Sequence, residues 1–202
     1  MIARVYTIGH STHQPERFIE LLRMHNITAV GDVRSNPYSK MNPQFNRETL
    51  KETLAAAEIT YVFLGRELGA RTPDPSCYVR GKVQYDKLAR TELFRAGLER
   101  VRTGMGRYRL ALMCAEKEPL GCHRGILVAR ELHTIGIEVL HILSDGSLES
   151  HDTAMGRLCA QLKLPQSDLF RTREDVIEEA YRIQGGRIAY EQAEEAATRL
   201  ES

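Results

Sequence analysis

The chain has 202 residues, of which 42% are hydrophobic, and its 28 Lys and Arg residues nearly balance its 27 Asp and Glu residues. This composition suits one globular domain with a hydrophobic core, and it excludes a strongly basic nucleic-acid binder and an acidic disordered chain. We expect no membrane attachment and a cytoplasmic location, because no apolar run could span a bilayer, no signal-peptide pattern is present, and four cysteines are too few for a disulfide scaffold.

The first third of the chain alternates short apolar runs, typical of buried strands, with amphipathic segments, typical of helices that cover a sheet. In chain order this pattern predicts a strand over 4–8, a helix over about 14–25, a strand over 28–33, a helix over about 46–57 and a strand over 60–64. Gly9 ends the first strand, and a polar loop with Pro37 and Pro43 follows the second.

The middle of the chain continues the alternation after a long segment, residues 65–82, whose glycines and prolines predict a loop. Two further helices are marked by apolar residues at helical spacing, one by Phe94, Leu98 and Val101 and the next by Val128, Leu132 and Ile135. Strands are predicted over 108–113 and 138–143. Five strands separated by helices predict a single three-layer α/β domain with a largely parallel five-stranded sheet, Rossmann-like or rhodanese-like.

The end of the chain differs from the main body in charge and pattern. We expect the α/β domain to cover residues 1–165 and a helical extension to cover 166–202, where nine acidic residues face only five basic ones. Thr172 and Asp175 have the spacing of a capping box, and Gly185-Gly186 is predicted to break the helix that this box begins. A homodimer formed through the extension is one alternative for its role.

Chemically capable side chains follow nearly every predicted strand. Because parallel strands end at one edge of a sheet, and ligands bind in the crevice beyond that edge, we expect these side chains to line one pocket. The predicted catalytic residues are His10, Asp32, Cys114 and Glu116. The predicted substrate-binding residues are Ser11, Arg34, Lys117, Cys122, His123 and Arg124.

These residue types predict a pocket for an anionic ligand, either a nucleotide or a nucleic-acid phosphate, in a hydrolase or transferase that acts on a phosphate-containing substrate. The two arginines and the lysine are expected to hold the negative charge. The carboxylates and His10 are expected to carry out acid–base steps, and Cys114 is the expected nucleophile, with Cys122 as the second choice.

Several of these residues also have a structural interpretation. His10 and Ser11 have the residue types that cap a helix, and Asp32 with Arg34 has the charges of a structural ion pair. A cysteine at the end of an apolar strand, such as Cys114, is often a small buried side chain. The residues expected only to pack in the core are Cys77, His141 and Cys159.

The segment from Cys114 to Arg124 predicts a strand, a polar loop and the start of a helix. This arrangement resembles the cysteine site of rhodanese-type sulfurtransferases and cysteine phosphatases, and the triplet Asp32-Val33-Arg34 resembles an early rhodanese motif. The loop departs from the compact glycine-rich cradle of those families. A rhodanese-like sulfur-transfer or thiol-redox protein is therefore an alternative that rests on fold-level analogy.

The sequence also raises the questions of metal binding and of nucleic-acid binding. Cys114, Cys122, His123 and His10 have the atoms that bind zinc or iron, but the chain has no Cys-x-x-Cys pair, and adjacent residues rarely bind one ion, so we predict no metal and no cofactor. Basic, aromatic and amide residues are interleaved in the loop 34–47, which is typical of contacts to phosphates and bases, and the loop 66–82 adds four basic residues and Tyr78. A non-catalytic nucleic-acid-binding module is the second alternative.

A series of short motifs gives the chain a family resemblance. In order they are Thr7-Ile8-Gly9-His10-Ser11, Asp32-Val33-Arg34, Leu64-Gly65-Arg66-Glu67-Leu68-Gly69, Met113-Cys114-Ala115-Glu116-Lys117, Cys122-His123-Arg124 and His141-Ile142. Over about residues 3–145 the chain resembles the uncharacterised prokaryotic family called domain of unknown function 488. The resemblance implies a cytosolic α/β domain but no particular reaction.

Overall fold

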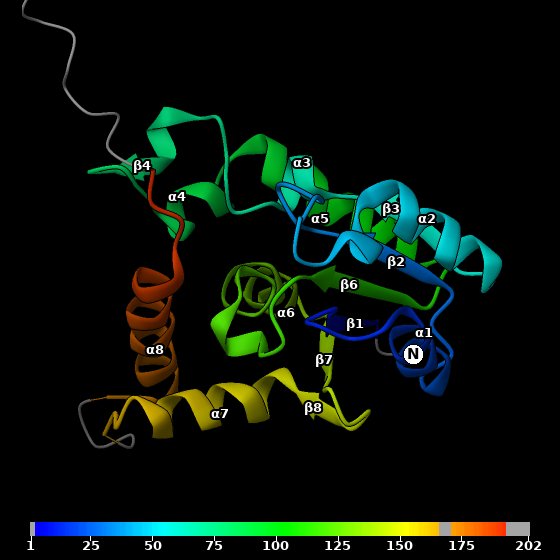
Figure 1. Ribbon diagram of the computed structural model, residues 1–202. Helices are drawn as coiled ribbons and strands as arrows, with labels where there is room; N and C mark the ends of the chain where they lie inside the picture. The colour runs from blue at the N-terminus through cyan, green and yellow to red at the C-terminus, as the bar shows by residue number, and fades with distance from the viewer. Residues whose placement is uncertain (1–2, 166–170, 193–202) are drawn as a thin grey trace, which may run out of the picture.

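The computed structural model describes residues 3–165 and 171–192, and it is built around a six-stranded sheet (Figure 1). The strand order is β3-β2-β6-β1-β7-β8, and the first five strands in this order are parallel. The strands are β1 (Arg4–Gly9), β2 (Ala29–Asp32), β3 (Thr60–Phe63), β6 (Leu110–Cys114), β7 (Glu138–Ile142) and β8 (Leu148–Ser150). The predicted five-stranded parallel sheet is confirmed, and β8 adds an antiparallel edge strand beside β7.

Helices cover both faces of the sheet, so the predicted three-layer arrangement is present. On one face, α1 (Pro15–Met24) and α2 (Arg47–Ala56) pack a core cluster against the sheet, with Phe18 and Leu54 fully buried. On the other face lie α5 (Glu92–Met105), a π-helical segment η4 (Arg124–Ala129) that continues into α6 (Arg130–Thr134), and α7 (His151–Gln161). Alternate residues of β6 divide between the two clusters, as the pleat of a strand requires.

The long segment after β3 contains short elements rather than one irregular loop. These are α3 (Gly65–Leu68), the 3₁₀ turn η2 (Pro75–Cys77), a hairpin of β4 (Tyr78–Val79) and β5 (Lys82–Val83), and α4 (Tyr85–Ala89). Two further 3₁₀ turns are η1 (Pro43–Phe45) and η3 (Pro119–Gly121). Elements this short leave no periodic pattern in the sequence, because hydrophobic periodicity needs several turns or alternations.

The helix that begins at Thr172 differs in length from its prediction. The capping box of Thr172 and Asp175 is present, but α8 runs from Arg173 to Ile188 and is not broken at Gly185-Gly186. Gly185 is buried against Tyr85, and this packing compensates for the weak helix propensity of glycine. A second correction concerns Ile135, which is 53% exposed and does not belong to the buried face of the preceding helix.

The described part of the predicted C-terminal extension, residues 171–192, packs against the preceding part of the chain. The Gln184 side chain donates to the Leu120 carbonyl, and the chain beyond α8 pairs with the β4–β5 hairpin through Val83 N–H to the Tyr190 carbonyl, at 2.9 Å. Figure 1 shows α8 and this hairpin on the side toward which β1 and β6 point. Residues 166–170 and 193–202 of the predicted extension lie outside the described residues, and its part in a homodimer stays a prediction. None of the helices in ranges 3–165 and 171–192 is both long and apolar enough to cross a membrane.

A chain of buried hydrogen bonds ties the second half of the molecule to β1. Thr7 Oγ1 bonds His141 Nδ1 at 2.7 Å, His141 Nε2 bonds His151 Nδ1 at 3.0 Å, and His151 Nε2 bonds the Tyr181 hydroxyl at 2.7 Å. His141 is therefore a hydrogen-bonded core residue, as expected. Burial, followed by the charge of neighbouring residues, lowers the pKa of His151 to about 4 and the pKa of His141 well below its usual value.

Stability should therefore fall as the pH is lowered from about 6.5 towards 4. An unfolded histidine takes up a proton near pH 6.5, whereas folded His151 stays neutral until about pH 4, so the contribution is complete above 6.5 and is lost below it. For His151 alone the loss is up to about 3 kcal/mol. Urea denaturation between pH 4 and 7.5 measures the slope. His151→Gln, which cannot take up the proton, should make the slope shallower, and an unchanged slope in that variant would contradict the assignment.

Candidate active site

The carboxyl ends of β1, β2 and β6 meet at one edge of the sheet, as the sequence predicts. Backbone hydrogen bonds hold the three strand ends together, from His10 N–H to the Cys114 carbonyl and from Val33 N–H to the Met113 carbonyl. The ten predicted site residues all lie at the ends of these strands or after them, but they divide into groups with different surroundings. Asp32, Arg34 and His10 form a buried polar network. Arg124 holds the loop after β6, and Cys114, Cys122 and His123 cluster at a cavity.

Asp32 and Arg34 form a buried ion pair in the polar network. The carboxylate is fully buried and accepts both Nε and Nη2 of Arg34, at 2.9 and 2.7 Å, while Tyr61 donates to it at 2.9 Å. Arg34 Nη2 also donates to the Phe45 carbonyl. Burial, and then the negative charge of Asp32, raises the pKa of the Tyr61 hydroxyl, so this hydroxyl remains a donor. The geometry matches the structural ion pair that the sequence allowed as an alternative.

His10 completes this network as a neutral imidazole. Arg34 Nη1 donates to His10 Nε2 at 3.2 Å, so the His10 proton lies on Nδ1, which donates to the Ser11 carbonyl at 2.9 Å. The ring stacks on Phe45 with centroids 4.3 Å apart. Burial lowers the pKa of His10 to about 4. Neither His10 nor Ser11 caps the first helix, because its N-cap residue is Gln14, which makes no side-chain cap hydrogen bond.

Arg124 supports the loop that follows β6. Its side chain is 1% exposed, and its two terminal nitrogens donate to the carbonyls of Glu116 and Lys117, at 2.6 and 3.0 Å. The loop passes so close to β1 that a Cβ on Gly9 would lie 1.9 Å from the Glu116 carbonyl oxygen. Arg124 therefore holds backbone oxygens, and the Lys117 contact is made by its carbonyl rather than its ammonium group.

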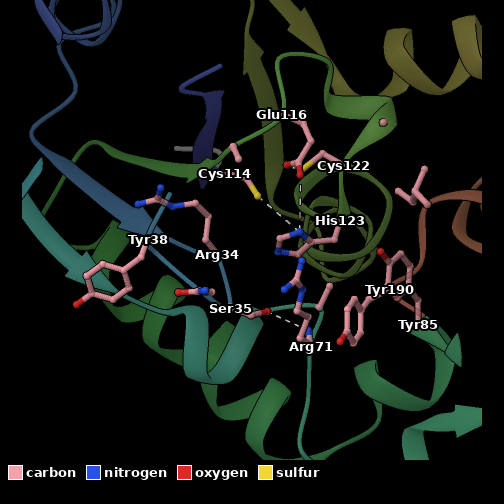
Figure 2. A pocket seen from close by; sticks show the side chains of 15 residues that line it. Arg34, Ser35, Tyr38, Arg71, Tyr85, Cys114, Glu116, Cys122, His123 and Tyr190 are labelled. Atoms are coloured by element: carbon pink, nitrogen blue, oxygen red, sulfur yellow. Dashed lines mark hydrogen bonds between the residues drawn. The ribbon is translucent and has the colours of Figure 1, made fainter. Parts of the chain in front are cut away.

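Two thiols and an imidazole come together in the third group. Cys114 Sγ lies 3.6 Å from His123 Nδ1, Cys122 Sγ lies 4.0 Å from the same atom, and Cys122 Sγ lies 2.9 Å from a carboxylate oxygen of Glu116 (Figure 2). Although Cys122 and His123 are adjacent, their side chains reach the same place. Cys122 has an extended backbone, with φ −137° and ψ 143°, while His123 is already helical, and this change of direction turns both side chains to one side.

The two thiols differ in their electrostatic surroundings. Burial and the neighbouring Cys122 raise the pKa of Cys114. Burial also opposes ionisation of Cys122, but the hydrogen bond from Cys114 and the positive charge of Arg124 outweigh it, so the pKa of Cys122 is lowered. Burial, followed by the charge of Cys122, raises the pKa of Glu116. Of the two thiols, Cys122 is therefore the one whose ionisation the surroundings favour.

A cavity of about 340 Å³ opens above this cluster. Of the ten predicted residues, those that line it are Arg34, Cys114, Glu116, Cys122 and His123. The guanidinium of Arg34 bonds Asp32 and His10. Figure 2 shows that it points away from the two thiols. His10, Ser11, Asp32, Lys117 and Arg124 do not line this cavity.

Some residues that line the cavity are not among those predicted from the sequence. Arg71 lies within a predicted basic loop but was not assigned to the site, and its guanidinium stacks on the Tyr190 ring, 4.6 Å from the centroid. Figure 2 shows Arg71 extending towards His123, with Tyr38 and Tyr85 at other sides of the cavity. The basic composition of 66–82 was a signal for Arg71, whereas nothing in the sequence connects Tyr190 to this edge.

Comparison with known proteins gives one finding. The family model described as Domain of unknown function DUF488 matches residues 14–130, which is more than half of the chain. This stretch includes the cluster residues Cys114, Glu116, Cys122 and His123, together with Arg71. Searches of curated proteins and of solved structures gave no match.

Proposed function

The chain belongs to the DUF488 family, and from the site that its matched segment builds we propose that the protein binds a small phosphate-bearing anion in the cavity and catalyses hydrolysis or group transfer on it. One observation carries this proposal. A guanidinium with no carboxylate partner among the described residues, that of Arg71, lines the same cavity as the cluster of Cys114, Cys122, His123 and Glu116.

Arg71 supplies the anion-binding end of the cavity. Its backbone N–H donates to Ser35 Oγ at 2.9 Å, which fixes the start of the side chain, and stacking on Tyr190 fixes the orientation of the guanidinium. A guanidinium held in this way offers two parallel N–H donors to a phosphate or carboxylate. The neighbouring polar side chains of Ser35 and Asn36 add further donors.

The size and the aromatic lining of the cavity favour a nucleotide as the ligand. Its volume of about 340 Å³ lies within the range of small-molecule pockets and is too small for a duplex. Three tyrosines, Tyr38, Tyr85 and Tyr190, line the cavity, and stacking on an aromatic side chain tolerates any base. Small nucleotides are therefore preferred over the nucleic-acid strand that the two basic loops suggest.

The reacting atoms are expected to lie at the cluster end of the cavity. Cys114, Cys122 and His123 face the substrate in this proposal, and Glu116 moves a proton beside them, because its carboxylate reaches both Cys122 and the cavity. Asp32, Arg34, His10 and Arg124 act as positioning residues. They fix the strand ends and the loop on which the reacting groups stand.

Removing the Arg71 guanidinium should weaken phosphate binding by about 10-fold or more, because a hydrogen bond to a charged group contributes about 1.5–3 kcal/mol. Calorimetric titration with inorganic phosphate and with the four ribonucleoside 5′-monophosphates measures this in the native chain and in Arg71→Ala. Chromatography of the same mixtures after incubation detects turnover. Arg66→Ala is the matched control, since Arg66 is an exposed arginine that does not line the cavity.

Three results would contradict the proposal. Equal weakening in Arg71→Ala and Arg66→Ala would mean that only the overall charge matters. No binding of any member of the series to the native chain would remove the small-ligand site. Binding of oligonucleotides alone, with an affinity that falls steeply with salt, would favour a nucleic-acid-binding module instead.

A further inference from the structure

The two thiols and the imidazole at the base of the cavity have the spacing of metal ligands. Cys114 Sγ, Cys122 Sγ and His123 Nδ1 all lie within 4.8 Å of one another, and the two sulfur–nitrogen distances are 3.6 and 4.0 Å. Tetrahedral zinc lies about 2.3 Å from sulfur and about 2.0–2.1 Å from nitrogen, which separates a sulfur and a nitrogen ligand by about 3.6 Å. The two sulfur–nitrogen distances are therefore close to the separation that one such ion requires.

The orientation of His123 is fixed from the other side of its ring. His123 Nε2 lies 3.0 Å from the Val33 carbonyl oxygen, and because a carbonyl only accepts, Nε2 carries the proton. Nδ1 is therefore the ring nitrogen that faces the two sulfurs. A histidine that binds a metal through one nitrogen usually donates its other N–H to such a carbonyl, which fixes both tautomer and ring orientation.

The backbone holds the Cys122 sulfur in place. The Arg124 N–H donates to Cys122 Sγ at 3.4 Å, and the buried Arg124 side chain places a positive charge behind the cluster. Cys114 approaches from a different element, the end of β6, and both cysteines are buried. Ligands that come from two rigid elements and are held by hydrogen bonds need little rearrangement to accept an ion.

The fourth coordination position of an ion bound by these three residues would face the cavity. Cys114, Cys122 and His123 all line the cavity, and Glu116 stands beside them with a carboxylate oxygen 2.9 Å from Cys122 Sγ. Closed structural zinc sites have four protein ligands, whereas catalytic sites have three and leave the fourth position for water or substrate. Two thiolates and one imidazole select zinc over magnesium or calcium, which prefer oxygen ligands.

We propose that Cys114, Cys122 and His123 bind one zinc ion, with its fourth position directed into the cavity beside Glu116. Zinc binds both sulfurs as thiolates, and any thiol proton that binding displaces is released to solvent. The ion would act as a Lewis acid for the anionic substrate. That role rests on the proposed function of the cavity, whereas zinc binding itself can be measured without any substrate.

The test uses the full chain, stripped of metal with a chelator under reducing conditions and then titrated with Co²⁺ or Zn²⁺. We expect one metal per chain by elemental analysis, and in the cobalt form a thiolate-to-metal charge-transfer band with the visible bands of tetrahedral cobalt. Cys114→Ser, Cys122→Ser and His123→Gln should each lower zinc affinity by at least about 100-fold, since losing even an outer partner of a ligand costs 10–100-fold. Cys159→Ser, which removes a thiol outside the cluster, should bind as the native chain does.

A second measurement needs no variant, so it remains informative if a substitution prevents folding. Zinc should protect Cys114 and Cys122 of the native chain from alkylation, and a chelator should restore their reactivity, while modification of Cys159 stays unchanged. A folded native chain with no charge-transfer band, or equal metal loss in Cys159→Ser and Cys114→Ser, would overturn the proposal. Metal binding with no effect of Arg71→Ala on phosphate affinity would reject the proposed function alone, and the reverse result would reject the metal site alone.

Discussion

Asp32→Asn should destabilise the protein by about 3–5 kcal/mol, which is the usual cost of removing one partner of a buried ion pair. Asp32 is fully buried and Arg34 is 6% exposed, so the guanidinium would stay buried with no negative charge beside it. The substitution also replaces one acceptor oxygen by an NH2 donor, so the side chain can no longer accept from Arg34 and Tyr61 on both atoms, and the support of His10 through Arg34 is weakened. Urea denaturation at pH 7, followed by circular dichroism, measures the free energy of unfolding.

Two further variants show how much of the cost of Asp32→Asn comes from the buried ion pair, rather than from one hydrogen bond or from the loss of any carboxylate. Tyr61→Phe removes one hydrogen bond to Asp32 and should cost only about 1 kcal/mol. Glu99→Gln breaks an exposed ion pair with Arg102 and should cost less than about 1 kcal/mol. If Asp32→Asn were no more harmful than Glu99→Gln, the pair would not support the strand ends as described.

Gly9→Ala should also be strongly destabilising, by about 2–3 kcal/mol, which is the upper part of the usual range for overpacking. The added Cβ would lie 1.9 Å from the Glu116 carbonyl oxygen, and backbone cannot move aside as a flexible side chain can. The same oxygen accepts from Arg124 at 2.6 Å, so the loop is held from both sides. The free energy of unfolding should fall, and the displaced loop should also weaken ligand binding in the cavity.

Gly156→Ala is the matched control for this substitution. Gly156 lies within α7, and a Cβ there would meet no atom within 4 Å. Alanine has a higher helix propensity than glycine, so this variant should be stabilised by up to about 1 kcal/mol. The two glycine substitutions should therefore change the free energy of unfolding in opposite directions. A Gly9→Ala protein with unchanged stability and unchanged phosphate affinity would contradict the close approach of the loop to β1.

The strands and the edge at which they meet could be predicted because both depend on local pattern and chain order. Apolar runs identified the five parallel strands, and the rule that parallel strands end together brought Asp32 and Cys114 to one edge. The partners of each side chain could not be predicted in the same way. At a strand end, a shift of one residue turns a side chain to the opposite face, so the sequence left Cys114 undecided between core and cavity.

Two other features of the site could not be predicted from the sequence: how adjacent residues are oriented, and which distant segments meet. The adjacency of Cys122 and His123 indicated diverging side chains, because the backbone angles that turn both to one side are not visible in the sequence. Tyr190 reaches the cavity through pairing with the β4–β5 hairpin, a contact between segments more than a hundred residues apart. The edge strand β8 was missed because it has three residues, none of them buried.

The cavity wall has one further consequence. Ile188 and Tyr190 line the cavity, yet they lie beyond residues 14–130, the stretch that carries the thiols, the imidazole and Arg71. The groups that would react and one surface that would select the ligand are thus encoded in separate parts of the gene. Related chains can inherit the first and exchange the second, so proteins with the same cysteines and histidine are free to differ in the molecules they accept.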